Sequence, residues 1–175
     1  MIVDIHKMKE NVVEYLFHMW QAEDLIRACG FDIEALRRSV VDRCDQPEEV
    51  RRQTVRRYEE LIEMMQAEGV EEKGHVRLCR DVLTELSDLH LRLLREPGET
   101  AYGAVYGQTL PCIVQLRAKS GGTEMTEIET CFTAVYGYLL LRLQKREVNA
   151  ETAEAIRQIS TLLNFLAEKY ASIRM

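Results

Sequence analysis

Apolar side chains recur at alternating steps of three and four residues along most of the chain. This spacing places them on one face of a helix. In the first segment the apolar face consists of Ile5, Met8, Val12, Tyr15, Met19, Ala22, Ile26 and Cys29. Further segments with this period lie within 33–44, 55–65, 76–93 and 156–173, and no segment of useful length alternates with period two. The pattern predicts an all-α protein.

The ends of the first three predicted helices carry helix-terminating and capping residues. Gly30 supplies a left-handed stop to a helix over residues 5–29. Asp32 is a suitable N-cap for a second helix over residues 33–44. Pro47 fits the first turn of a third helix, which ends at Gly69.

The later helices are predicted from similar signals. The fourth carries its apolar face from Val76 to Leu93, and Pro97 follows it. A fifth helix over residues 100–119 contains Pro111, which lacks an N–H group and predicts a bend there. Thr126 with Glu129 matches a capping box that opens a sixth helix, although Thr123 could cap one turn earlier. Asn149 caps the last helix.

The connections between these helices are short, so consecutive helices are expected to pack as antiparallel neighbours. The sequence therefore predicts a single up-and-down bundle of six or seven helices, formed by one domain over residues 1–175.

The charge balance argues against two classes of partner. The chain has 29 acidic and 23 basic side chains and a net charge of −6. A negative protein is repelled by nucleic-acid phosphates and by anionic lipids. Residues 37–57 hold seven arginines but also four acidic residues. We interpret this stretch as a solvated helix face with ion pairs at i,i+4; an anion or nucleic-acid patch is the alternative.

The cysteines and the apolar runs predict a cytoplasmic location. The five cysteines are widely spaced and form no CxxC pair, so we expect reduced thiols rather than disulfides or a zinc site. Charged residues interrupt any signal-peptide core near the N-terminus. The strongest apolar run, near residues 134–141, is far shorter than the ~20 residues of a membrane helix.

The sequence lacks the motifs that would indicate a metal site, a cofactor or catalytic residues. A di-iron bundle needs two ExxH motifs, and only Glu72 and His75 have that spacing. No nucleophile elbow, P-loop or dinucleotide fingerprint is present.

Polar residues embedded in apolar helices form the one candidate site. We predict that they build a buried polar network, with a ligand pocket beside the bend at Pro111 as the sharper alternative. The ligand-binding candidates are Trp20, Asp24, Arg27, His90, Gln108, Arg117 and Tyr136.

Several stretches of the chain resemble a family from Bacteroides-type bacteria described as a domain of unknown function. They include EYLFHMWQAEDLIRA (14–28), YGQTLPCIVQLRAKSG (106–121) and EIETCFTAVYGYLLLRLQKRE (127–147). The resemblance implies a helical protein over nearly the whole length and brings no activity, cofactor or site residue with it.

These features predict a non-enzymatic structural or interaction protein that forms a homo-oligomer. The last helix is the expected contact surface. Its main apolar stripe consists of Ile156, Ile159, Leu163, Leu166, Tyr170 and Ile173, and Leu162 and Phe165 widen the apolar surface beside this stripe. A small-molecule-binding protein or enzyme with a pocket near the bent fifth helix is the alternative, and a nucleic-acid-binding regulator comes third.

Overall fold

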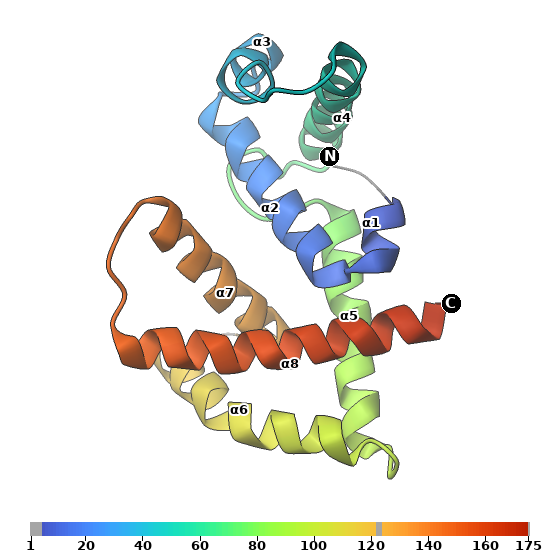
Figure 1. Ribbon diagram of the computed structural model, residues 1–175, viewed down its shortest axis with the longest axis vertical. Coiled ribbons are helices and arrows are strands. Elements are labelled where there is room, and N and C mark those ends of the chain that lie inside the picture. The colour runs from blue at the N-terminus through green and yellow to red at the C-terminus, as the bar shows by residue number, and fades with distance from the viewer. Residues whose placement is uncertain (1–4, 122–123, 175) are drawn as a thin grey trace. The chain divides into compact units, whose positions relative to one another are not determined.

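The computed structural model describes residues 5–121 and 124–174 (Figure 1). These residues form eight α-helices and one π-helical segment, and no strand occurs among them. The predicted all-α class is therefore confirmed, whereas the predicted count of six or seven helices is too low. No helix in these two ranges has the length and apolar character needed to cross a membrane.

The chain divides into two compact units, Met1–Asp81 and Val82–Met175. The single domain expected over residues 1–175 stays a prediction, and each unit is described by itself.

The helix predicted over residues 5–29 is two helices, α1 (Ile5–Glu10) and α2 (Val12–Ala28). Asn11 separates them with an extended backbone, at a φ of −151°. Its Oδ1 atom accepts hydrogen bonds from the backbone N–H groups of Val13 and Glu14, at 3.1 and 3.2 Å. This is N-cap chemistry, and it starts a new helix inside a continuous apolar pattern.

The second predicted helix also has a different form. After Gly30, which has the expected positive φ of 63°, the chain forms α3 (Ile33–Leu36) and the π-helical segment η1 (Arg37–Val41). Asp32 caps α3 as predicted, through Oδ1 at 2.9 Å from the N–H of Glu34. The helix ends at Val41 and not at residue 44.

The core of the first unit lies between α2 and α4 (Glu48–Ala67). Leu16, Met19 and Ile26 of α2 are fully buried. From α4, Leu61 and Met65 are fully buried as well. Helix α4 begins after Pro47 and ends before Gly69, which has a φ of 67°. Both ends confirm the sequence prediction.

The second unit holds α6 (Thr100–Lys119), α7 (Glu127–Leu143), α8 (Ala150–Arg174) and most of α5 (Arg77–Arg95). Helix α8 packs along both α6 and α7. The capping box of Thr126 and Glu129 is confirmed. Asn149 Oδ1 accepts from the N–H of Thr152 at 2.7 Å, as its predicted role requires. The alternative cap at Thr123 lies outside the described residues.

Helix α8 is more deeply covered than the sequence predicts. Leu162 is fully buried, together with Ile159 and Leu166 on the main stripe, and Phe165 is half-buried. Because α6 and α7 cover it from two sides, only Ile173 of the predicted contact surface is well exposed. The second width of open apolar surface expected beside the main stripe is therefore absent at Leu162, and self-association through the last helix stays a prediction.

Helix α6 continues through Pro111. The proline removes one helical N–H group but does not end the helix. Gly107 and Pro111 both lie on the exposed side of α6, where water can bond a carbonyl that proline leaves without a donor. A bend at Pro111 stays a prediction.

Candidate functional site

In the first unit, a buried carboxylate ties α2 to the start of α5. Glu23 projects from α2 and its side chain is 0% exposed. One carboxylate oxygen accepts from the backbone N–H of Val76 at 2.9 Å, and the other accepts from His75 Nδ1 at 2.6 Å. The imidazole of His75 also stacks on the indole of Trp20, with ring centroids 4.1 Å apart and planes 8° apart. Both carboxylate oxygens are therefore satisfied by the segment before α5.

Arg27, one turn after Glu23 on α2, binds the same connection. Its guanidinium donates to the carbonyl of Glu71 at 3.2 Å and to the carbonyl of Val70 at 2.9 Å, and it also donates to the carbonyl of Gly74 at 2.5 Å. Asp24 accepts a further hydrogen bond from Arg27 at 3.2 Å. The planar guanidinium offers several donors in fixed directions, so one side chain fixes a turn that has no helix of its own.

In the second unit, the polar cluster surrounds His90 of α5, whose side chain is 2% exposed. Its Nδ1 atom lies 2.7 Å from the hydroxyl of Tyr102, and its Nε2 atom lies 3.2 Å from a carboxylate oxygen of Glu127. A carboxylate can only accept, so Nε2 carries the proton and Nδ1 accepts from Tyr102. The hydroxyl of Tyr106 donates to the other oxygen of Glu127 at 3.1 Å.

Burial sets the protonation of this cluster. Burial lowers the pKa of His90, and the hydrogen bond to Glu127 opposes that shift only in part. Burial also raises the pKa of Tyr102. The same cause, together with the hydrogen bond to Glu127, raises the pKa of Tyr106 to about 12. At neutral pH the cluster therefore holds a neutral imidazole and two neutral phenols around one carboxylate, which joins α5, α6 and α7.

The remaining predicted site residues lie on α6 and α7 of the second unit. Gln108 is exposed on α6. Arg117 is half-buried and donates to the backbone carbonyl of Met125, across the turn between α6 and α7. Tyr136 is half-buried on α7. The predicted set is thus divided: Trp20, Asp24 and Arg27 belong to the first unit, and the other four belong to the second.

The partners of these residues were missed from the sequence. They are Glu23, His75, Tyr102, Tyr106 and Glu127. A signal existed for Glu23, because it lies between Met19 and Ile26 on a helix whose apolar residues recur at that spacing. Glutamate at such a position is buried only with partners, which identifies it as a network member. No comparable signal distinguished Tyr102 from an ordinary core tyrosine.

Metal ligands and thiols provide no site. Among the residues that the structure describes, no group of three or more histidine, cysteine or carboxylate side chains is arranged to hold a metal ion. All five cysteines are free. Cys79 and Cys131 are buried, Cys29 and Cys112 are half-buried, and Cys44 is exposed. Burial raises the pKa of Cys131 to about 12, which keeps this thiol protonated and unreactive.

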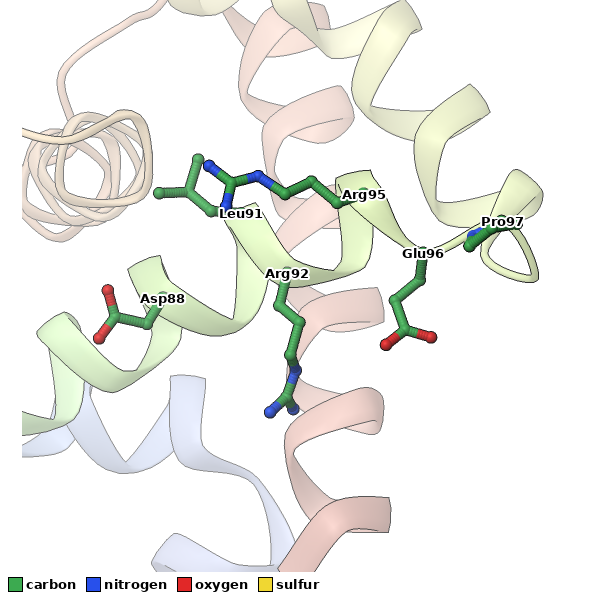
Figure 2. Close-up of a pocket in the computed structure, with 6 residues that line it drawn as sticks. All are labelled: Asp88, Leu91, Arg92, Arg95, Glu96 and Pro97. Atoms are coloured by element: carbon green, nitrogen blue, oxygen red, sulfur yellow. The ribbon is translucent and has the colours of Figure 1, made fainter.

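A shallow groove of about 450 Å³ follows the last turns of α5, and Figure 2 shows the six residues that line it. Arg92 and Glu96 extend to the same side of the helix end in this view, while Asp88 points away from them. Within the described ranges, neither Arg92 nor Arg95 forms an ion pair with Asp88 or Glu96. All four charged side chains are exposed. The groove is therefore an open, solvated surface.

A second groove, of about 390 Å³, lies in the first unit between η1 and α4. Arg37, Arg51, Arg52 and Arg56 line it. Each of these arginines has an acidic partner, in the pairs Arg37–Asp42, Arg51–Glu48, Arg52–Glu49 and Arg56–Glu60. Only Arg56–Glu60 has the predicted i,i+4 spacing, because Arg51 and Arg52 pair three residues back. The four arginines are nevertheless ion-paired, which compensates their charge locally.

The exposed face of α6 has an unusual composition. No charged residue occurs from Thr100 to Leu116, although the chain is 30% charged. Between the first and last residues of this helix, Thr100 and Lys119, which are also exposed, the exposed residues fall on one face: Ala101, Ala104, Gly107, Gln108, Pro111, Val114, Gln115 and Ala118. Tyr102, Thr109 and Ile113 are buried on the opposite side. Surface helices normally carry charged residues on the side away from the core, and this one presents small, apolar and amide side chains.

The second half of α7 is also poorly covered. Ile128, Cys131 and Phe132 in its first half are fully buried, whereas no residue from 136 to 143 is buried. Leu139 and Leu143 are 37% and 66% exposed. The α6 face and the end of α7 are thus two apolar surfaces that the described part of the second unit leaves open, and the α6 face is our candidate functional site.

No curated protein and no solved structure matches the chain. The expected origin in Bacteroides-type bacteria stays a prediction. A family model with the description "Domain of unknown function (DUF4924)" matches residues 1–175, so the chain belongs to this family.

Proposed function

We propose that this chain is a non-enzymatic interaction protein that self-associates through the exposed face of α6. The observation that carries the proposal is the absence of charge from Thr100 to Leu116 on a helix with one side in solvent. Val114, at 58% exposure, is among the most exposed large apolar residues described. Contact surfaces are depleted of charged residues at their centre, because a buried charge without a partner costs free energy.

The two polar clusters support a non-enzymatic role. Each hydrogen-bonding atom described for Glu23, His90 and Glu127 has a partner inside its own unit. A catalytic acid or base has to reach a substrate atom. The clusters join helices and connections, and this arrangement supports a positioning role for them.

Sedimentation velocity at tens of micromolar tests the proposal, and we expect a species larger than the monomer that dissociates on dilution. A monomer throughout this range overturns the proposal. The Val114→Lys variant puts a charge at the centre of the surface and should weaken association at least tenfold, which is about 1.4 kcal/mol.

Leu91→Lys is the matched control for Val114→Lys. Leu91 is a similarly exposed large apolar residue, at 48%, and it lies on α5 outside the α6 face. This variant should associate like the unmodified chain. If the two variants weaken association equally, the α6 face is not the contact surface.

A further inference from the structure

We propose that His75 of the first unit is a modification site, whose Nε2 atom accepts a phosphoryl group from a small, activated phosphoryl donor. The proposal goes beyond self-association, because it concerns a reactive side chain in the unit that does not contain α6. It rests on the way Glu23 and Trp20 hold the imidazole, with one ring nitrogen engaged and the other open.

Glu23 selects the ring nitrogen that can react. Its carboxylate can only accept a hydrogen bond, so Nδ1 of His75, at 2.6 Å, carries the proton. The lone pair of the neutral ring is then on Nε2. This atom has no hydrogen-bond partner among the described residues, and the side chain is 30% exposed. His75 therefore presents a nucleophilic nitrogen to solvent.

The imidazole is also held in a fixed orientation. The other oxygen of Glu23 accepts from the N–H of Val76 at 2.9 Å, so the carboxylate is anchored on both sides. The indole of Trp20, itself buried, lies against one face of the imidazole, with ring planes 8° apart. Covalent chemistry is favoured when a neighbouring group holds the nucleophile in place and is itself oriented by a further contact.

The transfer step places a positive charge on the ring, and the surrounding side chains stabilise that charge. Nε2 attacks phosphorus, the bond between phosphorus and the leaving group breaks, and the leaving group departs with that electron pair. Nδ1 keeps its proton, so the substituted ring becomes cationic. The carboxylate of Glu23 faces this cation at 2.6 Å. Trp20 lies against it with ring centroids 4.1 Å apart, which is within the range of a cation–π interaction.

The surroundings of His75 suit the anionic group that the step leaves on Nε2. His75 lies two residues before Arg77, the first residue of α5, and the N-terminal end of a helix favours negative charge. The exposed neighbours Glu71, Glu72, Lys73 and Arg77 carry two charges of each sign. A neutral acyl group would gain nothing from the helix end, so these features favour a phosphoryl group.

Phosphorylation by phosphoramidate tests the proposal, with His18 as an internal reference. His18 lies on α2, is exposed, and has no hydrogen bond from its imidazole among the described residues. The full chain is treated with phosphoramidate, and mass spectrometry of its peptides measures the rate at each histidine. We expect His75 to react at least about tenfold faster than the more exposed His18, and phosphorus NMR to place the group on Nε2.

Two outcomes of this measurement overturn the proposal. A rate at His75 that does not exceed the rate at His18 would mean that exposure alone decides the reaction. A phosphoryl group on Nδ1 would mean that Glu23 does not hold that nitrogen. Neither measurement depends on self-association of the chain, so the proposed function is tested separately.

The Glu23→Gln variant tests the contribution of the carboxylate. The amide has nearly the same size but no negative charge, so the rate at His75 should fall at least about tenfold while the rate at His18 stays unchanged. Glu14→Gln is the matched control, because it changes an exposed glutamate of the same helix, and it should leave both rates unchanged. An unchanged rate at His75 in Glu23→Gln overturns the proposal. Circular dichroism checks the folding of both variants, and the comparison of His75 with His18 in the unmodified chain does not depend on them.

Discussion

Both units of the molecule contain a histidine hydrogen-bonded to a glutamate, but they bury opposite members of the pair. In the first unit the Glu23 side chain is 0% exposed and that of His75 is 30% exposed. In the second unit the His90 side chain is 2% exposed and that of Glu127 is 26% exposed. The same two residue types therefore solve different burial problems.

The difference lies in which group must be kept satisfied away from water. A buried carboxylate needs donors on both oxygens, and Glu23 receives them from His75 and from the backbone of Val76. A buried imidazole can stay neutral, and it then needs one hydrogen-bond donor and one acceptor. Tyr102 and Glu127 supply these to His90. We therefore expect the first unit to depend on its glutamate and the second on its histidine.

The largest expected effect follows removal of the buried carboxylate. Glu23→Ala leaves the N–H of Val76 without its acceptor and removes the contact that fixes His75. We expect the free energy of unfolding of the first unit to fall by about 3 kcal/mol. Glu127→Ala, at the more exposed glutamate, should cost clearly less. Urea denaturation of both variants measures this difference, and equal losses would contradict the comparison.

The two tyrosines of the second unit allow a matched pair of substitutions. Tyr102→Phe deletes the hydroxyl that donates to fully enclosed Nδ1 of His90 and should cost about 2 kcal/mol of unfolding free energy. Tyr106→Phe deletes a half-buried hydroxyl that donates to Glu127, and water can replace it, so we expect a loss of about 0.5–1 kcal/mol. A larger loss for Tyr106→Phe would show that Glu127, and not His90, is the member that the second unit must satisfy.

The stability of the second unit should depend on pH through His90. Because burial lowers the pKa of this imidazole in the folded state, the unfolded state binds the proton first as the pH falls. Stability is therefore full above the unfolded pKa of about 6.5 and decreases as the pH falls below it, by at most about 1.4 kcal/mol per pH unit. Denaturation from pH 7.5 to 5 should show this slope, and His90→Asn should reduce it. A wild-type stability that rises as the pH falls from 7.5 to 5 would contradict the assignment.

A modest effect is expected at Asn11, which divides residues 5–28 into two helices although their apolar pattern is continuous. Asn11→Ala removes the side-chain oxygen that caps α2 and should lower the stability of the first unit by about 1 kcal/mol. Asn11→Asp keeps the acceptor and should be nearly neutral. If Asn11→Ala instead stabilises the protein, residues 5–28 favour one continuous helix, and the break has another cause.

The sequence predicted the helical class and most helix ends because those features depend on local chemistry. The capping box at Thr126 and the caps at Asp32 and Asn149 involve residues only two or three positions apart. The two polar clusters were predicted less well, because their hydrogen bonds join residues that are distant in the sequence. His75 and Glu23 are 52 residues apart, and Glu127 and His90 are 37 apart, so periodicity along one helix cannot identify them as partners.

The exposure of α8 was predicted poorly for a related reason. Its apolar residues were read correctly, but the number of helices that cover them depends on tertiary packing. Leu162 is buried because α8 contacts both α6 and α7. The uncharged stretch of α6 was visible in the sequence, and only the structure shows that one side of it is exposed.

The π-helical segment η1 has a consequence for the family as a whole. The N–H of Asp42 bonds the carbonyl of Arg37 at 2.9 Å, five residues earlier, where an α-helix would bond the residue four earlier. Such a turn contains one residue more than an α-helical turn needs to connect the same two points. A relative that lacks one residue between 37 and 41 could therefore keep the same course of the chain with an ordinary α-helix. We expect single-residue gaps to concentrate in this segment when family members are aligned. In a relative with such a gap, the arginine that corresponds to Arg37 should be shifted by one position in the groove between η1 and α4.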